Sequence, residues 1–363
     1  MNQVSPPVMA GIVDCDIHPL PRSMGEVLQF LPERWRGYAA EYGMQMRAPF
    51  PAASTHPRMT PFTSRLDAWP PSGGPPGSDL DFMRAQHLDP NNVALGILQP
   101  LRPPAASHRN LDFGAALCTA VNQWQAEYFL AQEPRLRGSI VVHPEHPEAA
   151  VAEIARWARH PGFVQLTLPP RGSEPLGRRR YWPVLEAAAA HGLPVGLHVS
   201  GVSGHAVTAG GWPSYYIEEH QSLVAMMQAT VASLVLEGVF ERLPTLKVAM
   251  VEAGFAWVPP LAGRMDRAWR RLKSEVPALR RAPSEYLREH IWYTTQPIDE
   301  PERREDLIDL IDQIGWDRVM FSTDYPHWDF DDPAHILASG ATAAQRQAVF
   351  RDNALGFFGV TLP

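Results

Sequence analysis

The chain has 363 residues, of which 45% are hydrophobic and 20% charged, and its net charge is −7. This composition is ordinary for a folded protein, and the mixed charges form no basic stripe for nucleic acid. Two cysteines are too few for a disulfide framework. No apolar run reaches the roughly 20 residues of a membrane helix, and residues 1–10 do not resemble a signal peptide. We therefore expect a cytoplasmic protein.

Short apolar segments alternate with amphipathic stretches along the whole chain, which is typical of parallel βα units. The first predicted strand covers 11–18, and a loop rich in proline and glycine follows over 44–78. Such a loop inside a compact enzyme favours a lid or a contact between subunits. The later strands are predicted at 93–99, 138–143, 163–168, 194–199, 246–252, 291–296 and 318–324.

Predicted helices follow most of these strands. The clearest covers 216–241, where Leu223, Met227, Val231 and Leu234 recur at three- and four-residue spacing. The first strand is not followed by a glycine-rich turn, which argues against a dinucleotide-binding sheet. The other helices are predicted at 79–89, 111–132, 147–159, 180–191, 256–274 and 301–313. This order predicts an α/β fold, a (β/α)8 TIM barrel in which residues 1–363 form a single domain.

Polar residues stand at the ends of three predicted strands. Asp16 and His18 end the first strand, His198 the fifth and Asp324 the eighth. Because strand ends of a closed parallel barrel meet on one face, these residues can surround one metal ion. Each could instead cap a strand or form a buried hydrogen-bonded pair, but four such coincidences explain the pattern less well. Two imidazoles and two carboxylates suit Zn²⁺, with Mn²⁺ or Fe²⁺ as alternatives.

Other polar residues near the same ends are candidates for chemistry and for substrate binding. Glu252 ends the sixth strand, where it is a general acid or base, a further ligand or the partner of an arginine on the rim. Together with Asp324 and His327 it forms the predicted catalytic set. The predicted substrate-binding residues are Gln99, His143, Gln296 and Trp328.

The chain resembles the amidohydrolase superfamily, and within it the amidohydrolase-related group that contains aminocarboxymuconate-semialdehyde and γ-resorcylate decarboxylases. The resemblance runs over nearly the full chain and is most specific at 238–247 and 322–327. The first strand, with Asp14-x-Asp16-x-His18, is similar to the Asp-x-His-x-His of the family. The resemblance implies a metal-dependent enzyme, and homodimers are common in that group.

Two positions depart from the family pattern. Asp16 stands where many relatives carry a metal-binding histidine, and Glu252 stands where the decarboxylases carry a sixth-strand histidine. The loss of that imidazole favours hydrolysis, in which metal-activated water attacks a small, ring-containing organic substrate. The alternative is non-oxidative decarboxylation of an aromatic or muconate-type acid. A barrel that only binds, without catalysis, is the third hypothesis.

Overall fold

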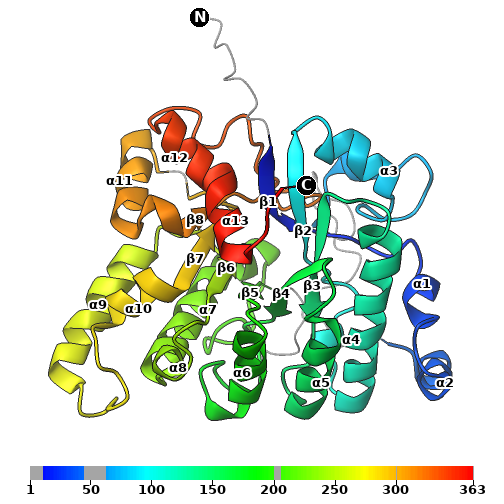
Figure 1. Cartoon of the computed structure of the whole chain (residues 1–363), viewed down its shortest axis with the longest axis horizontal. Helices are drawn as coiled ribbons and strands as arrows, with labels where there is room; N and C mark the ends of the chain where they lie inside the picture. Colours follow the sequence, from blue (N-terminus) through cyan, green and yellow to red (C-terminus); the bar gives the residue numbers. More distant parts are fainter. Residues whose placement is uncertain (1–10, 45–62, 200–205, 300, 363) are drawn as a thin grey trace, which may run out of the picture.

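The computed structural model describes residues 11–44, 63–199, 206–299 and 301–362. Within these residues, one parallel sheet of eight strands runs in the order β1 to β8, alternating with helices (Figure 1). Residues 1–10, which we do not expect to be a signal peptide, and 45–62, about half of the predicted loop, lie outside the described residues. The strands are β1 (Ile12–Ile17), β2 (Val93–Leu98), β3 (Leu136–Val141), β4 (Phe163–Leu168), β5 (Val195–His198), β6 (Val248–Val251), β7 (Ile291–Thr294) and β8 (Val319–Met320).

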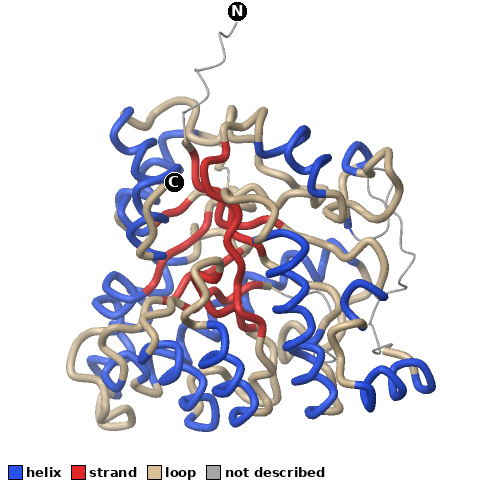
Figure 2. Tube along the Cα trace, turned by 45° about the vertical axis from the view of Figure 1, so that its right-hand side comes forward, coloured by secondary structure: helices blue, strands red, loops and turns tan. Residues whose placement is uncertain are grey.

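The first strand meets the segment that continues β8, so the sheet closes on itself. The backbone N–H of Cys15 donates to the carbonyl of Phe321 at 3.0 Å, and that of Asp324 donates to Asp16 at 3.1 Å. Figure 2 shows the strands in the middle of the molecule with the helices around them. The predicted (β/α)8 barrel is confirmed.

The helices are α1 (Gly25–Leu28), α2 (Glu33–Tyr42), α3 (Leu80–Met83), α4 (Leu111–Gln125), α5 (Pro147–Trp157), α6 (Trp182–Ala190), α7 (Tyr216–Leu236), α8 (Val239–Arg242), α9 (Val258–Leu272), α10 (Pro283–His290), α11 (Arg304–Ile314), α12 (Ala343–Gln347) and α13 (Asn353–Phe358). In the described part of the chain, no helix is both long and apolar enough to cross a membrane.

The helix predicted at 216–241 is divided in the structure. Helix α7 ends at Leu236, and α8 begins at Val239. Gly238 between them has a φ of 80°. This is the left-handed region, which glycine adopts at little cost because it has no Cβ. A glycine of this kind typically ends a helix, so the prediction of one continuous helix was wrong.

An apolar cluster fills the interior of the barrel beneath the carboxyl ends of the strands. Its members from the strands include Val13, Cys15, Leu95, Ile97, Val251 and Met320. Phe357 and Phe358 of α13 pack against the same cluster and extend it. The polar strand ends therefore lie above a packed apolar interior, as in other barrels of this type.

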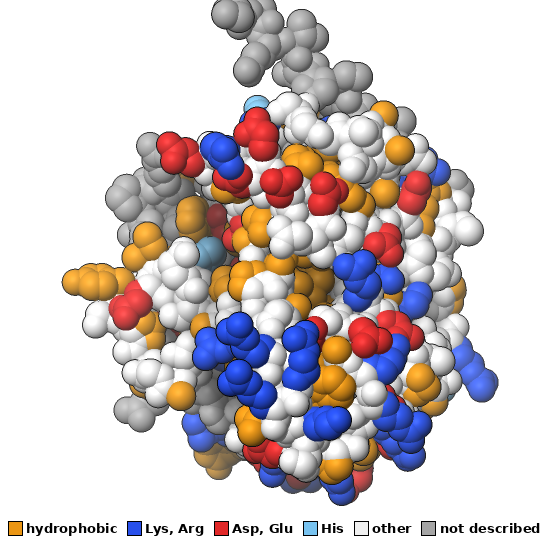
Figure 3. Space-filling model, turned by 90° about the vertical axis from the view of Figure 1, so that its left-hand side faces the viewer, with side chains coloured by type: hydrophobic (Ala, Val, Ile, Leu, Met, Phe, Trp, Pro, Cys, Tyr) orange, Lys and Arg blue, Asp and Glu red, His pale blue; other side chains and the backbone are white. Residues whose placement is uncertain are grey.

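The flank of the molecule drawn in Figure 3 carries both signs of charge. Acidic side chains gather over its upper part. Basic side chains gather over its lower part. This flank is therefore not a single basic surface.

Candidate metal centre

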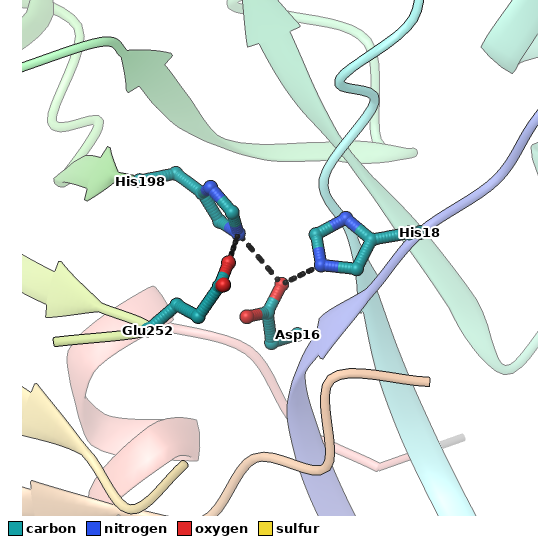
Figure 4. A group of neighbouring side chains, drawn as sticks. All are labelled: Asp16, His18, His198 and Glu252. Atoms are coloured by element: carbon teal, nitrogen blue, oxygen red, sulfur yellow. Dashed lines mark ion pairs between the residues drawn. The ribbon is translucent and has the colours of Figure 1, made fainter. Parts of the chain in front are cut away.

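The carboxyl ends of β1, β5 and β6 bring four polar side chains together (Figure 4). Asp16 Oδ1 lies 3.2 Å from His18 Nε2 and 3.2 Å from His198 Nε2. His198 Nε2 also lies 3.2 Å from Glu252 Oε2. Potential ligand atoms of all four residues lie within 4.8 Å of one another. The convergence that the sequence predicts for Asp16, His18 and His198 is present in the fold.

Asp324, just after β8, joins the same cluster from the other side of the closure. Its Oδ1 lies 2.7 Å from His18 Nε2 and 2.7 Å from His327 Nδ1. Its Oδ2 accepts a hydrogen bond from Gln296 Nε2 at 3.2 Å. The Asp324 side chain is completely buried. A fully buried carboxylate between two imidazoles is a position typical of a ligand or an acid–base group.

Several atoms of this centre lack the partner that burial demands. Among the described residues, both carboxylate oxygens of Asp16 and the Nε2 atoms of His18 and His198 have no hydrogen-bond partner. The Nδ1–H of His18 donates to the carbonyl of Gln99 at 2.8 Å, and that of His198 donates to Val199. When Nδ1 carries the ring hydrogen of a histidine in this way, Nε2 is left as the acceptor atom. Acceptor atoms that face carboxylate oxygens fit a bound cation, because hydrogen bonds alone leave them unsatisfied.

Burial also sets the protonation of the centre. It lowers the pKa of His18 to about 3 and that of His327 to about 4, so both rings are neutral at pH 7. Burial, together with the neighbouring carboxylates, raises the pKa of Glu252 and of Asp324 well above the ordinary value. The cluster thus contains more negative groups than it can hold ionised without a cation.

The backbone turns sharply at two of these carboxylates. Glu252 has a φ of 57° and Asp324 a φ of 64°. Residues other than glycine in this left-handed region cost about 1–3 kcal/mol each when the surrounding fold imposes it. Such strain is concentrated at functional sites, and here it occurs at two carboxylates of one cluster.

A cavity of about 130 Å³ lies over the centre. His18, Glu252 and His327 line it, whereas Asp16, His198 and Asp324 do not. Apolar side chains also contribute to its walls: Leu20, Leu101, Val199 and Leu223. A molecule in this cavity therefore meets both polar groups of the centre and an apolar surface.

The residues predicted to bind substrate do not line this cavity. Gln99 contacts the centre through its backbone carbonyl, and Gln296 contacts it through Asp324. The indole N–H of Trp328 donates to the hydroxyl of Tyr216, a residue that does line the cavity. His143 donates from Nε2 to the carbonyl of His108 at 2.7 Å and lines a separate pocket. The structure therefore does not bring His143 to the centre.

The described end of the predicted loop lies over the mouth of the barrel. Thr63 and Ser64 line the cavity. The carbonyl of Thr63 accepts the backbone N–H of Trp328 at 2.9 Å, and Arg65 N–H donates to the carbonyl of Pro326 at 3.0 Å. Both the predicted lid and the predicted subunit contact stay predictions.

Sequence reasoning missed the network of Asp14, which lies directly beside the centre. Oδ2 of Asp14 accepts hydrogen bonds from His87 Nε2 at 2.8 Å and from the Thr323 hydroxyl at 2.6 Å. Oδ1 accepts the backbone N–H groups of Thr323 and Asp16 at 2.9 and 3.2 Å. Asp14 therefore holds the end of β1, at Asp16, against Thr323, the residue before Asp324. In the sequence, Asp14 could have been identified only from its position in the Asp14-x-Asp16-x-His18 motif of the first strand.

A second histidine–carboxylate pair lies next to Glu252. His220 Nε2 lies 3.1 Å from Asp329 Oδ2. His220, Glu252 and Asp329 offer ligand atoms within 4.8 Å of one another. Neither His220 nor Asp329 is among the site residues predicted from the sequence. Since His220 and Asp329 also line the cavity, they extend its polar side.

The comparisons with known proteins agree with this architecture. A family model described as amidohydrolase matches residues 13–360. The γ-resorcylate decarboxylase of Polaromonas sp. is 26% identical over 298 residues, which cover 77% of this chain and 87% of the relative.

Two solved structures share the fold. An amidohydrolase from Mycobacterium avium subsp. paratuberculosis has a TM-score of 0.73 at 22% identity, over 96% of this chain and 99% of the other. A 5-carboxyvanillate decarboxylase from Novosphingobium aromaticivorans, with bound manganese, has a TM-score of 0.73 at 18% identity, over 98% of each chain. The family model covers nearly the whole chain. The chain therefore belongs to the amidohydrolase family and is a metal-dependent enzyme of that superfamily, a hydrolase or a carboxy-lyase.

Proposed function

We propose that this enzyme is a metal-dependent, non-oxidative decarboxylase of an aromatic acid. The observation that carries the proposal is the set of unsatisfied, buried ligand atoms on Asp16, His18 and His198 at the mouth of the barrel. The resemblance of the chain to γ-resorcylate decarboxylases supports the choice of reaction. Hydrolysis, which the absence of a sixth-strand histidine favours, is supported at the level of the superfamily, and decarboxylation is supported more closely.

Asp16, His18, His198 and Asp324 are the proposed metal ligands. The two carboxylates and two imidazoles accept Mn²⁺ as well as the Zn²⁺ expected from the sequence. The manganese in the structure from N. aromaticivorans favours Mn²⁺. When bound, the ion supplies a Lewis acid that attracts anionic oxygens of the substrate. The homodimer expected from the resemblance stays a prediction.

Glu252 is the proposed proton donor, because its side chain lines the cavity while three of the proposed ligands do not. In the reaction, the Glu252 carboxyl transfers its proton to the ring carbon that bears the substrate carboxylate. The bond between that carbon and the carboxylate then breaks, its electron pair returns to the ring, and CO₂ leaves. The Glu252 carboxylate takes up a proton from water to complete the cycle. His327, held by Asp324, orients the bound acid.

The direct test is a reaction of the manganese-loaded protein in D₂O with 2,6-dihydroxybenzoate and 5-carboxyvanillate. We expect release of CO₂ and one deuterium at the ring carbon that carried the carboxylate, measured by gas analysis and NMR. Cleavage of aryl esters, amides or lactones without CO₂ release from either acid would contradict the proposal and restore hydrolysis.

Removing the metal should abolish activity reversibly. We expect dipicolinate followed by gel filtration to lower turnover by about 100-fold or more, because the remaining side chains cannot supply a Lewis acid. The melting temperature should also fall, since a ligand at 100 times its Kd stabilises the native state by about 2.7 kcal/mol. Adding Mn²⁺ should restore both values. Full activity in protein shown to be metal-free would contradict the assignment.

Replacing Glu252 by glutamine should separate proton transfer from metal binding. We expect Glu252→Gln to keep its metal and to lower kcat by about 10²–10⁴-fold, the usual contribution of a general acid. Glu148→Gln is the control, since the Glu148 side chain is 92% exposed on α5. Metal content and turnover are measured on the same samples. If Glu252→Gln loses its metal, Glu252 is a ligand and not the proton donor.

A further inference from the structure

A buried ion pair forms part of the wall of the same cavity. Arg171 follows β4 and Glu219 lies in the first turn of α7. Arg171 Nη2 donates to Glu219 Oε1 at 3.0 Å, and the two side chains are 1% and 7% exposed. Both residues line the cavity together with His18 and Glu252. The Arg171 side chain therefore forms part of the wall that a molecule in the cavity meets.

Arg171 is left with donors that nothing in the described chain accepts. Its Nε and Nη1 atoms are buried and have no hydrogen-bond partner among the described residues. Arg84 gives a contrast within the same molecule, because all three of its nitrogens donate, to Glu133, Asp81 and the carbonyl of Gln132. Burying charged N–H groups without acceptors is costly, and at the wall of a cavity a ligand can supply the missing acceptor.

The chemistry of that acceptor follows from the donor. A guanidinium group presents several N–H groups in one plane and matches the geometry of a carboxylate. Glu219 takes one of these donors and orients the plane, leaving Nε and Nη1 for another partner. The cavity also has apolar walls, formed by Leu20, Val199 and Leu223. They suit a ligand with a hydrophobic middle, one polar end at the metal centre and the other at Arg171.

We propose that Arg171 binds a second carboxylate of the substrate, so that the enzyme acts on an aromatic acid with two acidic groups. One carboxylate reacts at the metal centre, and the other is held by Arg171 as a specificity-determining contact. The inference of an aromatic substrate with a reacting carboxylate rests on the proposed function. The inference of a second carboxylate rests on the Arg171 donors that have no acceptor among the described residues.

The test is calorimetric binding of three probes to the full-length, manganese-loaded protein: benzene-1,3-dicarboxylate, benzene-1,4-dicarboxylate and benzoate. We expect at least one dicarboxylate to bind about 10-fold or more tightly than benzoate, the factor that one charged hydrogen bond supplies. Arg171→Gln should reduce this ratio to about one and leave the benzoate Kd within about three-fold. Arg180→Gln is the matched control, since Arg180 is a partly exposed arginine in the short helical turn Arg179–Tyr181 and does not line the cavity.

A second variant keeps the proposal testable if the Arg171→Gln protein does not fold. Glu219→Gln keeps Arg171 and removes the competing negative charge, so the affinity for the preferred dicarboxylate should rise by about three-fold or more. Equal affinity of the parent for benzoate and both dicarboxylates would overturn the proposal whatever the variants do. An unchanged ratio in a folded Arg171→Gln protein would also overturn it.

The outcome for Arg171 can be separated from that for decarboxylation. The probes report binding at equilibrium, whereas CO₂ release reports the reaction. A dicarboxylate preference that depends on Arg171, in a protein that releases no CO₂ from any acid, would reject the decarboxylase and retain Arg171 as an anchor. Decarboxylation of monoacids with no preference for diacids would reject the anchor and retain the decarboxylase.

Discussion

Replacing Asp324 by alanine is expected to remove the metal and to lower turnover by about 10³-fold or more, as loss of both a ligand and its charge does. Oδ1 of Asp324 lies 2.7 Å from both His18 Nε2 and His327 Nδ1, and Oδ2 accepts from Gln296. Truncation removes one of the two carboxylates of the proposed ligand set. It also leaves the buried amide of Gln296 with one acceptor fewer.

Plasma mass spectrometry on the purified proteins measures the first effect, and steady-state turnover measures the second. The parent should hold about one transition metal per chain and the Asp324→Ala variant about one tenth of that or less. Asp309→Ala is the control, because Asp309 is exposed on α11. Stoichiometric metal in the Asp324→Ala variant would reject the four-ligand centre. No metal in the parent after reconstitution would reject the metal-dependent mechanism altogether.

Much of the fold could be predicted because it depends on local patterns. Buried parallel strands are nearly continuous apolar runs, and amphipathic helices separate them, so the order of the elements defines the barrel. The errors lie where a single residue decides the geometry. Gly238 ends α7 early through its left-handed backbone, a feature that the apolar stripe before it does not reveal.

The candidate centre could be predicted in part for the same reason. Asp16, His18 and His198 close apolar runs, and in a barrel such ends meet. His143 follows the same rule but directs its ring to the carbonyl of His108, so the rule also selects residues that take no part. Arg171 could not be found by this rule. Its partner Glu219 lies 48 positions later in the sequence, and only the packing of α7 brings the two side chains together.

Asp14 shows the limit of sequence reasoning most clearly. In the motif it resembles Asp16, which lies two residues later, yet the two carboxylates have different surroundings. Among the described residues, the Asp16 carboxylate has no hydrogen-bond partner, whereas the Asp14 carboxylate accepts four hydrogen bonds, from His87, from Thr323 and from the backbone N–H of Asp16. The register of β1 against β2 shifts between Asp14 and Ile17. This irregularity, and not the spacing of the residues, separates the carboxylate of the metal centre from the structural one.

Replacing Asp14 by alanine should therefore produce the largest loss of stability among these variants. The Asp14 side chain is fully buried, and its removal leaves His87 Nε2, the Thr323 hydroxyl and two backbone N–H groups without their acceptor. Breaking one partner out of a buried charged network costs about 3–5 kcal/mol. We expect a loss of that size in the free energy of unfolding, measured by urea denaturation of the metal-free proteins.

Two further variants test whether the network is the cause. Thr323→Val removes only the hydroxyl donor and should cost about 1 kcal/mol, the value of one hydrogen bond. Asp112→Ala, at an aspartate whose side chain is 70% exposed, should change stability by less than about 0.5 kcal/mol. Because Asp14 holds the segment before Asp324 against the segment before Asp16, Asp14→Ala should also weaken Mn²⁺ binding, although Asp14 is not a proposed ligand. An Asp14→Ala protein with parental stability and parental Mn²⁺ affinity would show that the closure of the barrel, and not this carboxylate, positions the centre.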